Sequence, residues 1–345
     1  MSVSGTRRSH RASGEGGASG SPRRPRVLHV TPMYPTPEKP SRGAFVASQI
    51  KSLAPYADID LYVLPGGGGI GPYLTHIGEL RRRIRGDHDI VHAHYGNLGT
   101  LVKMIGTNGK PVVTSYCGTD LNGDRGFKER QFAKLNRRYA AKDAHAIAKS
   151  EGLAAHIRGI APALSVIPTG VDLDRFAPAA REEARARIKI PSDKPVILFP
   201  ANPDDANKNF ALIERALGAS RKEVLLVTFP GGKIPHERIP DYMNAADLVV
   251  LASLKEGSPN VVKEAMSCNR PVLSTDCGDV RWLLEGVSKS AVLSYDAAEW
   301  APHFAAIASG DLPGESNGRE ILKQKGLGED AVARKILSVY ESLLR

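Results

Sequence analysis

Residues 246–266 read ADLVVLASLKEGSPNVVKEAM, and they give the clearest indication of the fold of this chain. Its first eight residues form a short apolar run that predicts a buried β-strand. From residue 261 onward, apolar side chains recur at helical spacing, and the glycine and proline of EGSPN separate the two patterns. The stretch therefore predicts a strand, a loop and a helix in direct succession, which is the repeating unit of a parallel α/β sheet.

Two carboxylates eight residues apart, Glu256 and Glu264, belong to this unit. Glu256 lies in the predicted loop, and open parallel sheets bind ligands at the carboxyl ends of their strands, where such loops lie. Glu264 lies among apolar helix residues, where a carboxylate is costly to bury unless a group such as a sugar hydroxyl pairs with it. From spacing alone, the two could equally be an ordinary turn residue and a solvated helix residue.

The same alternation of apolar runs and helical patterns continues on both sides. Strands are predicted at residues 27–30, 59–63, 90–93, 111–114, 144–148, 164–167, 196–199, 224–227, 248–251, 271–274 and 291–293. A chain of 345 residues exceeds the usual size of one hydrophobic core. We therefore expect an α/β fold of two doubly wound, Rossmann-like domains that face each other across a cleft, where nucleotide ligands commonly bind.

The domain organisation follows from composition. Residues 1–25 are rich in glycine, serine and arginine and poor in apolar residues, which predicts a disordered basic arm. We expect the first domain at residues 26–172, the second at 173–322 and a final helix at 323–345.

Charge and cysteine usage limit the partners and the compartment. The chain has a net charge of +10, no apolar run long enough to cross a membrane and no N-terminal apolar stretch typical of a secretory signal, which predicts a cytoplasmic protein. Three scattered cysteines suggest neither a disulfide framework nor a zinc site. The basic residues at 81–85 indicate either peripheral contact with an anionic inner membrane face or a helix docked on a core. Nucleic acid is not expected, because stacking aromatics are not interleaved with the basic residues.

The segment from Tyr242 to Ala265 resembles the donor-site signature of family 4 glycosyltransferases (glycosyl transferases group 1), which are retaining enzymes of the GT-B fold. The resemblance implies that the last helix returns to the first domain, that the first domain binds the acceptor and that the second binds a nucleotide-sugar donor. It assigns the ribose to Glu264 and the transferred sugar to Glu256, which is counted among the catalytic residues. The backbone of Ser258, Pro259, Asn260 and Val261, with Gly257, would lie along the donor.

The resemblance also places a phosphate-binding lysine at Lys208, which it makes a catalytic residue. The family generally has an arginine six residues earlier, where this chain has Asn202. In the first domain, the loop with Arg42 and Gly43 would meet the donor phosphate, and Arg42 would supply the charge that Asn202 does not. Its glycine would let the phosphate approach the backbone at a helix start.

On the acceptor side, the resemblance assigns His94 and Gly96 to the cleft wall. Cys117 stands where the family usually has a histidine close to the reacting sugar. Asp120, counted among the catalytic residues, would bind a sugar hydroxyl or cap the following turn. His92 and His94 lie on one face of a strand end, but no third metal ligand is evident nearby, so no metal is expected.

These features predict an enzyme that moves a sugar from a nucleotide-diphospho-sugar to a hydroxyl of a carbohydrate or lipid-linked acceptor, with retention and without a metal or cofactor. Two enzymatic alternatives stay open, a nucleotide-sugar epimerase and a phosphorylase of the same fold. The unusual residues Cys117 and Asn202 also leave open a non-catalytic sugar-binding protein.

Overall fold

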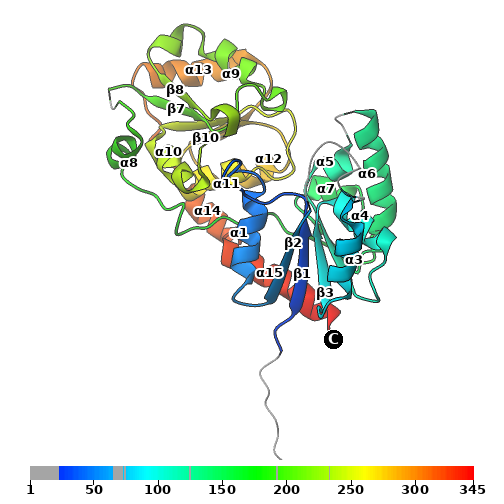
Figure 1. Ribbon diagram of the computed structural model, residues 1–345. Helices are drawn as coiled ribbons and strands as arrows, with labels where there is room; N and C mark the ends of the chain where they lie inside the picture. Colours follow the sequence, from blue (N-terminus) through cyan, green and yellow to red (C-terminus); the bar gives the residue numbers. More distant parts are fainter. Residues whose placement is uncertain (1–22, 65–72, 74, 124–125, 192, 233) are drawn as a thin grey trace, which may run out of the picture.

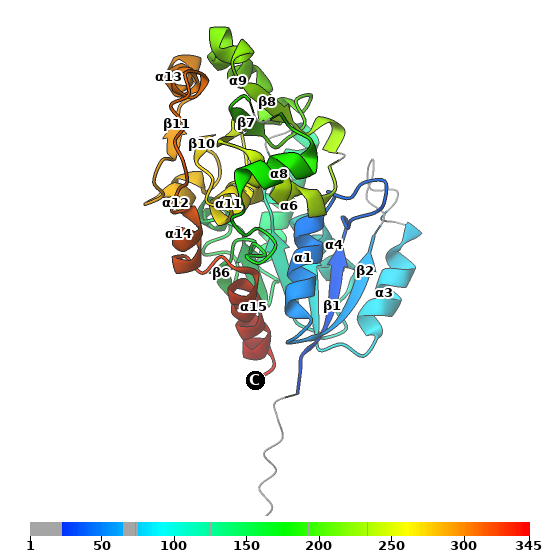
Figure 2. The ribbon, with the colours of Figure 1, turned by 90° about the vertical axis from the view of Figure 1, so that its left-hand side faces the viewer.

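The computed structural model describes residues 23–64, 73, 75–123, 126–191, 193–232 and 234–345 (Figure 1). The expected basic arm, residues 1–25, thus lies almost entirely outside the described residues. The described chain forms two parallel sheets, each flanked by helices (Figures 1 and 2). The expectation of two Rossmann-like α/β domains in a GT-B arrangement is confirmed.

The first domain contains a six-stranded sheet in the order β2-β1-β3-β4-β5-β6. Its strands are β1 (Arg26–Thr31), β2 (Asp58–Val63), β3 (Ile90–His94), β4 (Val112–Tyr116), β5 (His145–Ala148) and β6 (Leu164–Val166). Its helices are α1 (Ala44–Leu53), α3 (Ile77–Arg85), α4 (Gly96–Ile105), α5 (Thr119–Asn122), α6 (Phe127–Ala140) and α7 (Glu151–Ala155).

The second domain contains a five-stranded sheet in the order β11-β10-β9-β7-β8. Its strands are β7 (Val196–Phe199), β8 (Leu225–Thr228), β9 (Leu248–Leu251), β10 (Val272–Thr275) and β11 (Ala291–Leu293). Its helices are α8 (Arg181–Ile188), α9 (Phe210–Leu217), α10 (Ile239–Ala245), α11 (Asn260–Ser267), α12 (Val280–Leu284), α13 (Ala297–Ala308) and α14 (Gly318–Gln324), with short 3₁₀ turns η1 (Ala206–Lys208), η2 (Gly218–Lys222), η3 (Pro230–Gly232) and η4 (His236–Arg238).

Each predicted strand is present, with ends that differ by no more than two residues. The central strands β3, β4, β7, β9 and β10 are buried at every position. Parallel strands covered by helices on both faces need apolar side chains on both sides, so they read as continuous apolar runs and are easy to recognise.

The chain crosses between the domains twice, and the two crossing segments are paired. Val171 N–H donates to Leu327 O at 2.9 Å, and Glu329 N–H donates to Val171 O at 3.0 Å. The last helix, α15 (Glu329–Leu343), then packs against α1 of the first domain (Figure 2). Its apolar face, which includes Ile336 and Tyr340, is buried in a first-domain core. This is the returning helix that the resemblance implies, whereas the predicted boundaries at residues 172 and 322 stay predictions.

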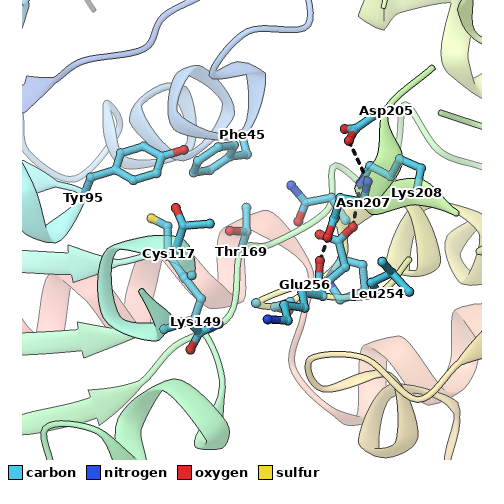
Figure 3. A pocket seen from close by; sticks show the side chains of 18 of the residues that line it. Phe45, Tyr95, Cys117, Lys149, Thr169, Asp205, Asn207, Lys208, Leu254 and Glu256 are labelled. Carbon is cyan, nitrogen blue, oxygen red and sulfur yellow. Dashed lines mark hydrogen bonds and ion pairs between the residues drawn. The ribbon is translucent and has the colours of Figure 1, made fainter. Parts of the chain in front are cut away.

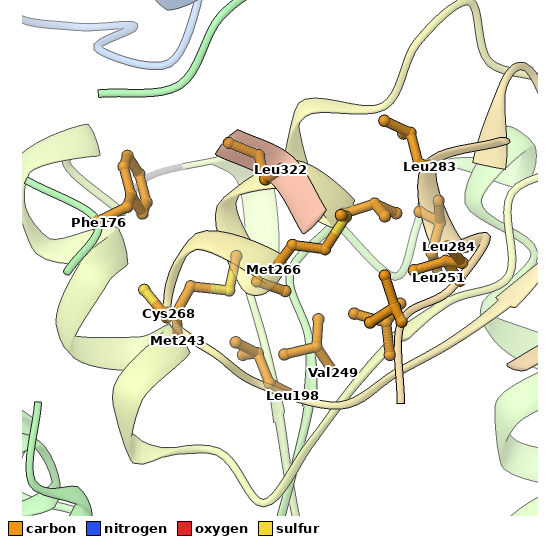
Figure 4. Close-up of a cluster of buried hydrophobic side chains, with 14 of the residues drawn as sticks. Phe176, Leu198, Met243, Val249, Leu251, Met266, Cys268, Leu283, Leu284 and Leu322 are labelled. Atoms are coloured by element: carbon orange, nitrogen blue, oxygen red, sulfur yellow. The ribbon is translucent and has the colours of Figure 1, made fainter. Parts of the chain in front are cut away.

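A hydrophobic core of the second domain joins several helices and strands (Figure 4). Leu198 of β7 and Val249 of β9 pack against Met266 of α11 and Leu322 of α14. Complete burial of side chains of this size contributes about 1.5–3 kcal/mol each. These buried contacts therefore fix α11 against β7 and β9.

Helix α3 carries the basic residues at 81–85. Its apolar residues Leu80 and Ile84 are buried in the first-domain core with β1 and β3, so its apolar face does not contact a membrane. Arg83 is also paired with Glu79 and Asp60. Of the two interpretations of this segment, the structure supports the docked helix.

Candidate functional site

A cavity of about 670 Å³ lies between the two domains (Figure 3). Its first-domain wall consists of Phe45 of α1 and of loops that follow β3, β4, β5 and β6. Loops that follow β7 and β9 form its second-domain wall. The lining residues are Phe45, Tyr95, Cys117, Gly118, Thr119, Asn122, Lys149, Thr169, Asp205, Ala206, Asn207, Lys208, Leu254, Lys255, Glu256, Gly257, Ser258, Pro259 and Asn260. The volume is in the range of cavities that hold small-molecule ligands.

Lys208 and Glu256 form an ion pair in this cavity. Lys208 Nζ lies 2.6 Å from Glu256 Oε1, although the two residues come from different loops. The loops are tied together because Asn207 Nδ2 donates to Lys255 O at 2.9 Å. The cavity therefore contains an ammonium group, and the start of α11 lines the same cavity. Backbone N–H groups at a helix start have no partner in the helix and can bind anions.

Gly257 brings the two domains into contact. A Cβ at this position would overlap the carbonyl oxygen of Cys117 in the first domain. Only glycine allows this approach. The predicted donor loop therefore packs directly against the predicted acceptor wall.

Lys263 was not predicted from the sequence, yet it supports this loop. Its Nζ donates to Ser258 Oγ at 3.1 Å and to Thr169 O, in the segment between the domains, at 2.8 Å. The side chain is fully buried, and burial lowers the pKa of Lys263 to about 8. Because its donors are used on protein oxygens, Lys263 fixes the position of Ser258 relative to the first domain.

Glu264 is buried within α11, with an exposed fraction of 9%. Its Oε1 lies 3.5 Å from His236 Nε2. Arg175 contacts the other ring nitrogen, Nδ1, of the same histidine. Because Arg175 can only donate, His236 accepts at Nδ1 and donates its Nε2–H to Glu264. Glu264 does not line the cavity itself, and its predicted contact with ribose stays a prediction.

Asp120 is buried and joins two loops of the first domain. Its carboxylate accepts hydrogen bonds from the backbone N–H groups of Gly96 at 2.7 Å, Gly118 at 2.7 Å and Cys117 at 3.1 Å. Burial raises the pKa of Asp120, and these three donors act against that rise. Asp120 positions the wall that carries Cys117, and the prediction that it binds a sugar hydroxyl stays untested.

His94 belongs to a buried cluster of three histidines behind the first-domain wall. His29 Nδ1 lies 3.0 Å from His94 Nε2, and the rings of His92 and His94 are stacked with centroids 4.6 Å apart. His92 contacts Tyr340 Oη at 2.5 Å and Ser115 Oγ at 2.8 Å. The expectation that no third possible metal ligand lies near His92 and His94 was wrong, because the pairing of β1 with β3 places His29 opposite His92. The ligand atoms of the three histidines lie within 4.8 Å of one another, close enough for the cluster to be considered as a metal site.

The loop that was expected to meet the donor phosphate precedes α1, and neither Arg42 nor Gly43 lines the cavity. Gly43 directly precedes α1 with φ 69°, and a Cβ there would overlap the Met33 carbonyl group, so glycine is required. Arg42 Nη2 donates to Pro32 O at 3.3 Å. Asn202 Oδ1 accepts from Gly231 N at 3.1 Å and organises a turn.

The first-domain wall contains residues that were not singled out in the sequence. Tyr95 has φ 77°, an uncommon value for a residue with a side chain, and its ring meets Phe45 edge-on with centroids 6.2 Å apart. Lys149 directly follows β5 and is buried at the cavity wall.

Cys117, which was singled out in the sequence, also lines this wall. Burial raises the pKa of the Cys117 thiol to about 12. Cys117 is therefore a neutral, weakly polar group at neutral pH.

The cavity brings together about half of the predicted site residues. It is lined by Cys117, Lys208, Glu256, Gly257, Ser258, Pro259 and Asn260. The predicted residues outside its lining are Arg42, Gly43, His94, Gly96, Asp120, Val261 and Glu264.

Among the described residues, no helix has the length and apolar character needed to cross a membrane.

Similarity to known proteins agrees with this geometry. Residues 18–175 match the family described as Glycosyltransferase Family 4, and residues 195–309 match Glycosyl transferases group 1. D-inositol 3-phosphate glycosyltransferase 1 of Catenulispora acidiphila is 28% identical over 314 residues, which cover 76% of this chain and 74% of that protein. A putative teichuronic acid biosynthesis glycosyltransferase of Bacillus subtilis is 29% identical over 211 residues, which cover 56% of this chain and 54% of that protein.

Solved structures share the fold. Sucrose-phosphate synthase from Thermosynechococcus elongatus superimposes with a TM-score of 0.74 at 17% identity, covering 93% of this chain and 99% of that chain. HepE of Anabaena, solved in complex with UDP-glucose, superimposes with a TM-score of 0.69 at 15% identity, covering 92% and 100%. The two family matches cover most of both domains, and the chain belongs to the group 1 glycosyltransferases of family 4.

Proposed function

We propose that this glycosyltransferase moves a sugar from a nucleotide-diphospho-sugar to a hydroxyl of a carbohydrate or lipid-linked acceptor, with retention and without a metal. One observation carries the proposal. The Lys208–Glu256 pair, with an N–O distance of 2.6 Å, lies in the interdomain cavity beside the start of α11. A cation and backbone donors in one cavity suit a diphosphate leaving group.

In this proposal the second domain holds the donor. Lys208 and the backbone N–H groups at the start of α11 stabilise the charge that develops on the departing diphosphate. Glu256 positions the sugar, and Glu264 holds the ribose. The acceptor hydroxyl attacks from the face that the diphosphate leaves, and the leaving phosphate takes its proton.

The first-domain wall then receives the acceptor. Tyr95 and Phe45 offer apolar ring surface of the kind that packs against sugar rings, and Thr169 offers a hydroxyl group. The solved HepE complex contains UDP-glucose, so uridine donors are the first to test. The proposal keeps a peripheral membrane location, which would depend on the basic side chains of residues 81–85 and not on the apolar face of α3, because that face is buried.

A panel of UDP-, GDP- and ADP-sugars tests this function by thermal stabilisation of the protein. We expect the nucleotide-sugars of one base to raise the Tm of the protein, because a ligand that binds only the folded state stabilises that state. Product analysis with the selected donor and a range of acceptors follows. Glycoside formation that requires an acceptor supports transfer, whereas conversion of the donor without acceptor supports an epimerase. Release of a sugar phosphate when inorganic phosphate is the acceptor supports a phosphorylase. Binding without donor turnover supports the non-catalytic alternative.

A further inference from the structure

Lys149 places a buried ammonium group at the first-domain wall of the cavity. The side chain is 3% exposed, and Nζ donates to Gln49 Oε1 of α1 at 3.0 Å. Among the residues that the structure describes, no carboxylate lies within ion-pair distance of it. Lys103, a buried lysine of the same domain, is by contrast directly paired with Asp143.

This arrangement is costly for the protein alone. An ammonium group taken out of water without a counter-charge loses several kcal/mol of hydration free energy, and one amide oxygen compensates only part of that loss. Burial accordingly lowers the pKa of Lys149. The other amide atom of Gln49, Nε2, is buried without a hydrogen-bond partner among the described residues. Lys149 thus carries a positive charge that no described carboxylate matches, and the neighbouring Gln49 Nε2 is a donor without a described acceptor.

The position of Lys149 relates it to the donor site. It lies with Cys117 and Thr169 on one side of the cavity, and Lys208 and Glu256 lie on the other side (Figure 3). The charge of Lys208 is matched by Glu256, whereas that of Lys149 is matched by no acidic side chain that the structure describes. A ligand that brings a negative charge would complete the first-domain wall.

We propose that Lys149, with Gln49, forms an anion subsite that takes a negatively charged group of the donor, either its diphosphate or a carboxylate on its sugar. The inference rests on the proposed function, which brings the donor into the cavity. It assigns to Lys149 the positive charge that Asn202 does not supply. Because Lys149 and Lys208 belong to different domains, an anion bound by both would also hold the two domains together.

Calorimetric titration of the wild-type protein and Lys149→Met tests the subsite. The probes are UDP, UDP-glucose, UDP-glucuronic acid and inorganic pyrophosphate, which needs no base recognition. If the Tm panel selects another base, the matching GDP or ADP compounds replace the three uridine probes. We expect Lys149→Met to weaken the Kd of at least one probe by about tenfold or more, because charge-assisted hydrogen bonds contribute about 1.5–3 kcal/mol. Weaker binding of all four probes by Lys149→Met assigns the subsite to the diphosphate. Weaker binding of UDP-glucuronic acid alone assigns it to a sugar carboxylate.

The stability of the variant distinguishes a binding role from a structural one. Removing an unpaired buried charge should raise the Tm of Lys149→Met, because methionine fills a similar volume without a hydration cost. A control double variant, Lys103→Met with Asp143→Asn, removes a buried ammonium together with its partner away from the cavity and should leave every Kd unchanged.

Two results would overturn the subsite. In the first, the wild-type protein binds the probes and Lys149→Met binds them equally well, which leaves the proposed function standing. In the second, the wild-type protein binds none of the four probes, which removes the proposed donor site together with its anion subsite. A lower Tm with unchanged Kd values identifies Lys149 as a purely structural residue and belongs to the first result.

Discussion

The two walls of the cavity hold their charges in different ways. On the second-domain wall, Lys208 is paired with Glu256, and Glu264 behind it faces His236. On the first-domain wall, Lys149 meets only an amide oxygen. The carboxylate of Asp120 is turned toward backbone N–H groups of the same domain.

This difference shows two ways to prepare a site for an anion. The second-domain wall is balanced without a ligand, so an incoming phosphate must share Lys208 with Glu256. On the first-domain wall, the charge of Lys149 has no acidic partner among the described residues. The unfavourable free energy of burying this charge is present before a ligand arrives and decreases when an anion binds. Variants on each wall should therefore respond differently in binding and in stability.

The largest expected effect is a loss of activity from a substitution on the second-domain wall. Lys208→Met should lower kcat by about 10²–10³-fold, the usual loss when one group that stabilises a leaving charge is removed. The Tm should change little, because an ion pair that is partly exposed contributes at most about 1 kcal/mol. Steady-state kinetics with the selected donor, together with thermal unfolding, measures both quantities. A normal kcat would exclude Lys208 from a phosphate role.

The next effect concerns Glu264. Glu264→Gln should weaken nucleotide binding by about 10–100-fold, because hydrogen bonds between hydroxyl groups and a charged acceptor contribute about 1.5–3 kcal/mol. Calorimetry with the nucleoside diphosphate of the selected base measures the change. Glu223→Gln, at an exposed position of the second domain, is the matched control and should bind normally. Equal affinities for both variants would remove the ribose assignment.

The second-domain wall was largely predictable from the sequence, because most of its residues lie close together along the chain. The strand, the EGSPN loop and α11 follow one another within 21 residues, and the resemblance covers them. The paired partner Lys208 follows a strand of the same sheet. Neighbouring loops at the carboxyl ends of parallel strands meet, so their side chains can be expected near each other.

The first-domain wall could not be predicted in the same way. Lys149 and Gln49 are 100 residues apart, and a lysine after a strand resembles any solvated residue at the start of a helix. Arg42 was expected to supply the missing charge, but its guanidinium group faces Pro32 and does not line the cavity. The β1–β3 pairing that brings His29 to His92 was also not deduced, although both lie in predicted strands.

The histidine cluster behind the first-domain wall should make stability depend on pH. Burial lowers the pKa of His29 to about 3 and lowers the pKa of His92 and His94 well below the usual value of 6.5. The unfolded chain binds protons near pH 6.5 and the folded chain does not. Stability is therefore complete above about pH 6.5 and is lost as the pH falls toward 3.

At pH 5 this loss is on the order of 2 kcal/mol per histidine relative to pH 7. Denaturant unfolding at both pH values measures it. Tyr340 of α15, Ser115 of β4 and Lys149 of the first-domain wall surround the cluster, and none of them gains a negative charge in this range that could offset histidine protonation. His29→Gln should reduce the pH dependence. An unchanged slope would show that His29 is not held neutral.

The smallest expected effect is that of metal removal, which should leave sugar transfer unchanged. Both ring nitrogens of His92 already have partners, Tyr340 and Ser115, and His29 is hydrogen-bonded to His94. A metal would have to displace these contacts, and charge stabilisation at the cavity is assigned to Lys208 and backbone N–H groups. Activity after dialysis against a chelator and elemental analysis of the purified protein measure the outcome. Stoichiometric zinc, or activity that returns only with added metal, would instead make the cluster a metal site and change the electrostatics of the wall in front of it.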